Sequence, residues 1–137
     1  MANTIRLEIA TPDAVVYSDD VDMVTLPGVE GQMGVLPHHI RLMTQLVPGE
    51  MVVRKDGRDS FLAVGEGLVE ITGDSVNIVT DMAVPADSID EARAQEAEQH
   101  AEARLREKIS AQEVASVHAA LARSLAQLYV RRRHRKI

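Results

Sequence analysis

Apolar and polar residues alternate in the first part of the chain. Ile5, Leu7 and Ile9 alternate with charged residues, and Val76 and Ile78 flank an asparagine. A period of two is typical of strands that bury one face. Turn signals between such runs predict short antiparallel strands, arranged as a β-sandwich or flattened barrel. The turn signals are Thr11-Pro12-Asp13, Pro27-Gly28, Glu30-Gly31, Pro48-Gly49, Lys55-Asp56-Gly57, Gly65-Glu66-Gly67 and Thr72-Gly73-Asp74.

The chain changes character near residue 86. All eight glycines and all five prolines lie before this position, whereas most of the alanines follow it. Alanine favours helices, and glycine and proline oppose them. The sequence therefore predicts a strand-built domain over residues 1–86 and a helical region over residues 87–137. The predicted fold class is α+β, an N-terminal flattened antiparallel β-sandwich followed by a C-terminal α-helical hairpin.

Two Ser-x-x-Glu patterns indicate where the helices begin. Each is a capping box, in which a serine and a glutamate satisfy backbone N–H groups at a helix start. The pairs are Ser88 with Glu91 and Ser110 with Glu113, and they predict helices that start near residues 89 and 111. A single continuous helix remains the alternative, because residues 109–111 contain neither glycine nor proline.

Both predicted helices carry stripes through which they can pack as an antiparallel hairpin. Alanine-rich stripes bury little apolar area, so we expect the hairpin to dock on the β domain with a free energy on the order of a few kcal/mol. The first helix offers Ala94, Ala97, Ala101, Leu105 and Ile109, and the second offers Val114, Val117, Leu121, Leu125 and Leu128 beside Ala115, Ala119, Ala122 and Ala126.

Charge divides near the same boundary. Residues 1–87 hold five basic and fourteen acidic side chains, net −9, and residues 88–137 hold ten basic and seven acidic ones, net +3. From Arg123 onward no residue is acidic, and the end of the chain, 131–136, is almost entirely basic. One or two cations suffice to complement the dipole of a helix C-terminus. The excess predicts an acidic partner, which could be a protein surface, nucleic acid or anionic lipid.

Several classes of function lack their signature residues. The chain has no cysteine, which excludes disulfides and thiolate sites. Its apolar runs of three or four residues are far shorter than the roughly 20 that span a bilayer. The first ten residues do not have the form of a secretion signal, so we expect a cytoplasmic location.

Three local patterns that could carry chemistry have simpler explanations. Gly28-x-x-Gly31-x-x-Gly34 lacks the Lys-Ser or Lys-Thr of a phosphate-binding loop and favours tight turns. His38-His39 has no third ligand nearby, which argues against a metal site. The acidic cluster 19–22 is typical of a solvated loop rather than a catalytic pair of carboxylates. We therefore expect no catalytic and no metal site.

One long segment resembles a known family. The run from Gly28 to His39, read with Leu42, Thr44, Leu46 and Pro48-Gly49, is similar to the ε subunit of bacterial F-type ATP synthase. The resemblance continues through Ala63–Glu70 and Ile89–Ala94 and covers essentially the whole chain.

The resemblance implies a fold and a set of partners. It implies a ten-stranded sandwich that binds the γ subunit and the ring of c subunits, and a hairpin that can leave the sandwich and restrain ATP hydrolysis. The chain would then be an accessory subunit rather than an enzyme, peripheral on the cytoplasmic face of the inner membrane. By resemblance, rotor contacts fall to Glu30, Gln32, His38 and His39, and contacts to the catalytic α and β subunits fall to Arg123, Arg131, Arg132 and Arg133.

The sequence also departs from the family pattern. Residues 38–41 replace a frequent Gly-His-Ala-Pro, and Gln32 stands where an acidic residue is common in the turn that faces the c-ring. Some relatives bind ATP through an Ile/Leu-Asp-x-x-Arg-Ala motif, which Asp90 and Arg93 match, but His100 replaces a further arginine. A mostly neutral imidazole is a poorer phosphate partner than arginine. ATP as a regulatory ligand and an ordinary Asp-Arg pair at a helix start both stay open, and no other cofactor is expected.

A free adapter with a nucleic-acid-binding basic tail is the rival interpretation. The net charge of −6 and the scarcity of aromatic residues argue against it. The sequence leaves open whether the coupling ion is H⁺ or Na⁺, how strongly hydrolysis is restrained, and whether the hairpin is folded or extended at rest.

Overall fold

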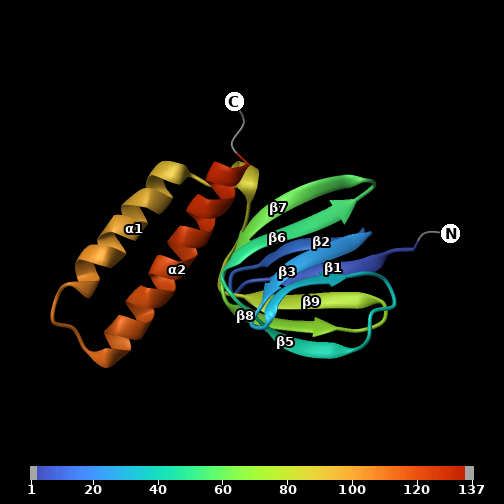
Figure 1. Ribbon diagram of the computed structural model, residues 1–137, viewed down its shortest axis with the longest axis horizontal. Helices are drawn as coiled ribbons and strands as arrows, with labels where there is room; N and C mark the ends of the chain where they lie inside the picture. The colour runs from blue at the N-terminus through green and yellow to red at the C-terminus, as the bar shows by residue number, and fades with distance from the viewer. Residues whose placement is uncertain (1–2, 135–137) are drawn as a thin grey trace.

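The computed structural model describes residues 3–134 and consists of a sandwich of strands with a helical hairpin at its side (Figure 1). This arrangement confirms the predicted fold class. The strands are β1 (Ile5–Ala10), β2 (Val15–Val21), β3 (Met23–Gly28), β4 (Gly31–Val35), β5 (Leu42–Leu46), β6 (Gly49–Lys55), β7 (Arg58–Val64), β8 (Gly67–Ile71), β9 (Ser75–Thr80) and β10 (Ala83–Pro85).

The ten strands form one continuous hydrogen-bonded network. Its order is β10-β7-β6-β3-β5-β8-β9-β1-β2, with β4 paired to β3 outside this path. The pair β1–β9 is parallel, and the other pairs are antiparallel. The other turns predicted from glycine and proline lie between strands or at their ends, but the turn predicted at Pro27-Gly28 is wrong, because both residues belong to β3 and pair with β4.

The hydrophobic core lies between the two halves of this network, which fold over each other. The alternation read from the sequence is confirmed, since Ile5, Leu7 and Ile9 are fully buried and their charged neighbours are exposed. Apolar side chains from the inner faces of the strands form this core. The fully buried large side chains are all aliphatic or methionine, and they include Leu26, Leu46, Met51, Ile71 and Ile78.

The hairpin has two separate helices, α1 (Glu91–Leu105) and α2 (Ala111–Arg133), after a short 3₁₀ turn, η1 (Ala86–Ser88). The two-helix prediction is therefore confirmed over a single continuous helix. Ser110 caps α2 as expected, its hydroxyl accepting the Glu113 N–H at 3.2 Å. The capping box predicted at Ser88 is wrong, because η1 contains Ser88 and the carboxylate of Asp90 accepts the Arg93 N–H instead.

The predicted helix faces are partly confirmed. Ala94 and Ala101 are buried, but Ala97 is exposed, and Ile109 lies beyond the end of α1. In α2 the prediction for Leu125 is wrong, since 46% of this residue is exposed while Leu128 is buried. The reason is that α2 lies between α1 and the sandwich and turns its Ala126 side toward β6 and β7 (Figure 1).

Candidate functional site

The interface between α2 and the sandwich is the candidate functional site. A small apolar cluster lies at its centre, separate from the main core of the sandwich. Three of its six buried members are alanines, each of which removes little apolar surface from water. Its members are Ala63, Met82, Ala86, Ile89, Ala126 and Val130, with Phe61 and Val84 packed against them.

A buried glutamate lies at one end of this interface. The Glu50 side chain is only 5% exposed, and its carboxylate lies 2.6 Å from Nε2 of His134. The imidazole stacks on the ring of Phe61 with 3.6 Å between ring centroids. The Arg133 guanidinium lies 3.6 Å from the other carboxylate oxygen. A carboxylate removed from water needs such partners, so the end of α2 and strand β6 are joined by a polar contact.

Three further arginines of α2 also contact the rest of the chain. Arg123 pairs with Asp81 at 3.0 Å, Arg132 pairs with Glu91 at 2.9 Å, and Arg131 donates to the Ala86 carbonyl at 3.4 Å. All four arginines predicted to reach catalytic subunits are thus engaged within this chain. The remaining basic residues of the predicted tail, Arg135 and Lys136, lie outside the described residues.

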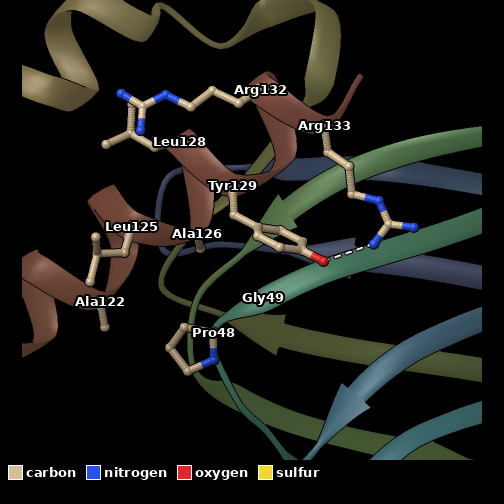
Figure 2. Close-up of a pocket in the computed structure, with 9 residues that line it drawn as sticks. All are labelled: Pro48, Gly49, Ala122, Leu125, Ala126, Leu128, Tyr129, Arg132 and Arg133. Atoms are coloured by element: carbon tan, nitrogen blue, oxygen red, sulfur yellow. Dashed lines mark hydrogen bonds between the residues drawn. The ribbon is translucent and has the colours of Figure 1, made fainter. Parts of the chain in front are cut away.

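An open groove runs beside this interface (Figure 2). Arg133 lies at one end, where its guanidinium donates to the Tyr129 hydroxyl at 2.8 Å. This hydrogen bond, together with the charge of Glu50, raises the pKa of Arg133 above its ordinary value. The groove is lined by Pro48, Gly49, Ala122, Leu125, Ala126, Leu128, Tyr129, Arg132 and Arg133.

The motif that resembles an ATP site opens α1. Asp90 is the N-cap of this helix, so its carboxylate is already occupied by a backbone N–H. Arg93 lines a cavity of about 340 Å³ between the helices, close to the lower limit of ligand pockets, which is about 300 Å³. His100 lines a second, shallower pocket beside Arg93. Glu96 lines the same pocket, and its carboxylate repels a phosphate group.

The four predicted rotor residues do not form one cluster. Glu30 and Gln32 lie at the start of β4, and His38 and His39 follow its other end. Three strand residues, 33–35, lie between Gln32 and the turn that holds the histidines, a rise of roughly 10 Å. His38 has a φ of 67° and donates its N–H to the Gly73 carbonyl, so its loop is held beside the turn between β8 and β9.

Exposed apolar side chains surround the loop of His38. Ile40 is 84% exposed and Met43 is 66% exposed, and Leu36 and Leu42 are exposed beside them. A concentration of exposed large apolar side chains in residues 36–43 favours a protein interface near this loop, although Leu42 and Met43 face opposite sides of β5. The sequence carries no local signal for this patch, because its residues are interspersed among turn and strand positions.

The roles of Glu50 and Phe61 were not predicted from the sequence either. A signal was present, because residues 51–53 and 61–64 are nearly continuous apolar runs, which is typical of strands buried on both faces. Glu50 and Phe61 belong to the outer face of β6 and β7, which α2 covers.

Within residues 3–134 no group of three or more histidine, aspartate or glutamate residues is arranged to hold a metal ion. No helix in this part of the chain has both the length and the apolar character that a membrane span requires.

Comparisons with known proteins agree with these features. Residues 4–86 match the family model "ATP synthase, Delta/Epsilon chain, beta-sandwich domain", and residues 87–131 match "ATP synthase, Delta/Epsilon chain, long alpha-helix domain". The ATP synthase epsilon chain of Herpetosiphon aurantiacus is 42% identical over 126 residues, covering 92% of this chain and 93% of that one. The ATP synthase epsilon chain 2 of Syntrophotalea carbinolica is 44% identical over 131 residues, covering 95% of both chains.

A solved structure is also similar. A chain in the Euglena gracilis mitochondrial ATP synthase structure, described as OSCP/F1/c-ring, superposes with a TM-score of 0.73 and 26% identity, over 89% of this chain and 78% of that one. These similarities confirm the recognition made from the sequence, including the interpretation as a non-catalytic subunit of a larger enzyme. The chain belongs to the ATP synthase delta/epsilon chain family.

Proposed function

We propose that this chain is a central-stalk subunit that links the rotating parts of an F-type ATP synthase and restrains ATP hydrolysis through its hairpin. Family membership over both domains supports the first role, and the similar Euglena gracilis chain belongs to an assembly with F1 and a c-ring. In this role the chain is peripheral to the membrane, on the cytoplasmic face.

The sandwich has two separated contact regions, which suits two rotor partners. The turn with Glu30 and Gln32 would meet the c-ring, and the loop with His38 and His39 would meet the γ subunit. The exposed apolar patch around Ile40 supports the second contact, because protein interfaces bury such surfaces. The two regions lie toward opposite ends of β4, so each could contact a different partner.

The restraint on hydrolysis would depend on an exchange of arginine partners. In the docked hairpin, Arg123, Arg131, Arg132 and Arg133 contact acidic groups or a carbonyl of this chain. Half-exposed ion pairs contribute about 0–1 kcal/mol each, so acidic segments of the catalytic subunits can compete for the same arginines. Release of the hairpin would then free the basic end of α2 to block rotation.

Family membership argues against the rival function. A nucleic-acid adapter would be a free protein, whereas both domains of this chain match the ATP synthase delta/epsilon family.

ATP as a regulatory ligand is a further part of the proposal. Arg93 would meet the phosphates, but the small cavity and the nearby Glu96 predict weak binding. Calorimetric titration of ATP into the isolated chain tests this, with Arg93→Ala as the variant that should abolish any heat of binding. An identical heat of binding from both proteins would exclude a role for Arg93 in ATP binding.

Truncation after Ala86 tests the main proposal. The strands end at Pro85, so the sandwich retains its whole hydrogen-bonded network. We expect the synthase to assemble with the truncated chain and to hydrolyse ATP faster than the complex with the full chain. Unchanged hydrolysis would refute the restraint. Failure of the truncated chain to assemble would place essential contacts in the hairpin, and failure of the full chain to copurify with the membrane ATPase would refute stalk membership.

A further inference from the structure

The groove beside α2 has walls from both parts of the chain. Pro48 and Gly49 of the sandwich form one wall and α2 forms the other, around a volume of about 1040 Å³. Figure 2 shows Pro48 and Leu125 on these two sides, with the Tyr129 ring between Leu125 and Arg133. The groove therefore exists in this form only while the hairpin is docked on the sandwich.

Two large apolar side chains are unusually exposed in the groove. Leu125 is 46% exposed and Tyr129 is 54% exposed, although both lie beside buried residues of the same helix. Tyrosine and arginine are the residue types that most often anchor protein interfaces, and this groove offers both. Side chains of this kind become buried when a partner protein covers them.

We propose that an amphipathic α-helix of another subunit docks in this groove. Residues 122, 125, 129 and 132 line it at spacings of three, four and three, the pattern by which one helix packs against another. The segment 122–133 provides a rise of about 16 Å, or three helical turns. A small molecule is a poorer occupant, because the groove is open along its length and such ligands need enclosure.

The two arginines of the groove indicate that the partner helix carries an acidic residue at one end. Arg132 and Arg133 are the charged residues that line it, and no acidic residue does. Their side chains remain 50% and 53% exposed although they pair with Glu91 and Glu50. A guanidinium has five N–H donors, so each can bind a second carboxylate. The partner therefore presents an apolar stripe that ends in aspartate or glutamate.

Occupation of the groove would stabilise the docked hairpin. A ligand that contacts both walls binds the docked form and not the released one, so it shifts the equilibrium by mass action. This consequence rests on the proposed function, in which the released hairpin restrains hydrolysis. The partner helix then relieves the restraint on ATP hydrolysis, and removal of the partner helix increases that restraint.

Photocrosslinking in the purified ATP synthase tests the inference. A photoreactive residue at Ala122 should attach to one helical segment of another subunit, with apolar residues at three and four spacings and a carboxylate at one end. The variant Leu125→Glu should lower the yield of this product at least about tenfold, because the apolar stripe of the partner would then bury an unpaired charge. The matched control is the same photoreactive residue at Gln99, an exposed position of α1, which should not give this product.

The inference is overturned if the chain copurifies with the synthase but Ala122 gives no product, or gives products only with lipid, detergent or a second copy of this chain. Circular dichroism of Leu125→Glu establishes that the variant folds, which its half-exposed position leads us to expect. Crosslinking does not depend on hydrolysis rates, so failure of the restraint and failure of the groove give different results.

Discussion

Glu50 and His134 are 84 residues apart in the chain, and their side chains meet at 2.6 Å. The carboxylate of Glu50 is nearly buried, and the imidazole is held in place by stacking on Phe61. Undocking would return the carboxylate to water but would also break its contacts with His134 and Arg133. This polar contact therefore links the end of α2 to the sandwich more specifically than the alanine-rich packing can.

Replacement of Glu50 by glutamine should weaken docking of the hairpin. The amide keeps the shape of the side chain but loses the negative charge that pairs with Arg133. We expect a loss of about 1–2 kcal/mol in docking free energy, which speeds hydrogen exchange of α2 amides about tenfold. Glu70→Gln, an exposed glutamate of β8, is the control. Unaltered exchange in the Glu50 variant would exclude a docking role for this carboxylate.

The Arg123–Asp81 pair should behave as a second, weaker link. Its side chains are 35% and 33% exposed, so solvent screens the interaction and we expect about 0.5–1 kcal/mol. Arg123→Asp and Asp81→Arg should each increase protease cleavage of the hairpin, and the combined swap should restore resistance. Additive damage in the combined variant would mean that the two side chains do not interact in solution.

Gly67 should tolerate no side chain. A Cβ built there would lie 2.0 Å from the Val79 carbonyl oxygen, so the backbone of β8 or β9 would have to move. We expect Gly67→Ala to lower the free energy of unfolding by about 1–3 kcal/mol or more, measured by urea denaturation. Gly73→Ala is the matched control, since nothing lies within 4 Å of its Cβ. Equal stability of the two variants would contradict the close packing of β8 on β9.

The apolar patch around the His38 loop should govern binding to the γ subunit. Ile40 is 84% exposed, so Ile40→Asp leaves the fold unchanged and places a charge in the proposed interface. We expect affinity for the purified γ subunit to fall at least about tenfold, because burial of an unpaired charge is costly. Val15→Asp, at an exposed valine of β2, is the control. Equal affinities for the native chain and Ile40→Asp would exclude this patch.

The sequence was informative where local patterns decide structure. Alternation at Ile5, Leu7 and Ile9 predicted buried strand faces, and Ser110 marked the start of α2. Both signals act over a few residues, so neighbouring positions suffice to read them. The cap predicted for α1 at Ser88 was wrong, because Ser88 is part of the 3₁₀ turn and Asp90 caps the helix instead.

Contacts between distant segments could not be predicted in this way. The stripe with Leu125 was expected to be buried, but the exposure of a helical face depends on which neighbours cover it. The position of Glu50 beneath the end of α2 depends on the docking of two domains, and no local spacing encodes it. The docked contacts of Arg123, Arg131, Arg132 and Arg133 were missed for the same reason.

A reducible crosslink that locks the hairpin in place tests the central claim most directly. The side chains of Met82 and Gln127 meet at 3.0 Å across the interface, and the chain has no native cysteine. Because cysteine is shorter than methionine and glutamine, Met82→Cys and Gln127→Cys are joined by a short bifunctional thiol reagent that contains a reducible disulfide, which can span the two thiols only when α2 is docked. The single variants, treated with the same reagent and reductant, control for effects on other subunits.

ATP hydrolysis by the assembled synthase is then measured with the lock closed and again after reduction. If release of the hairpin restrains hydrolysis, the locked complex hydrolyses ATP faster, and reduction lowers the rate to that of the native complex. Equal rates before and after reduction, with the crosslink verified, would contradict the account.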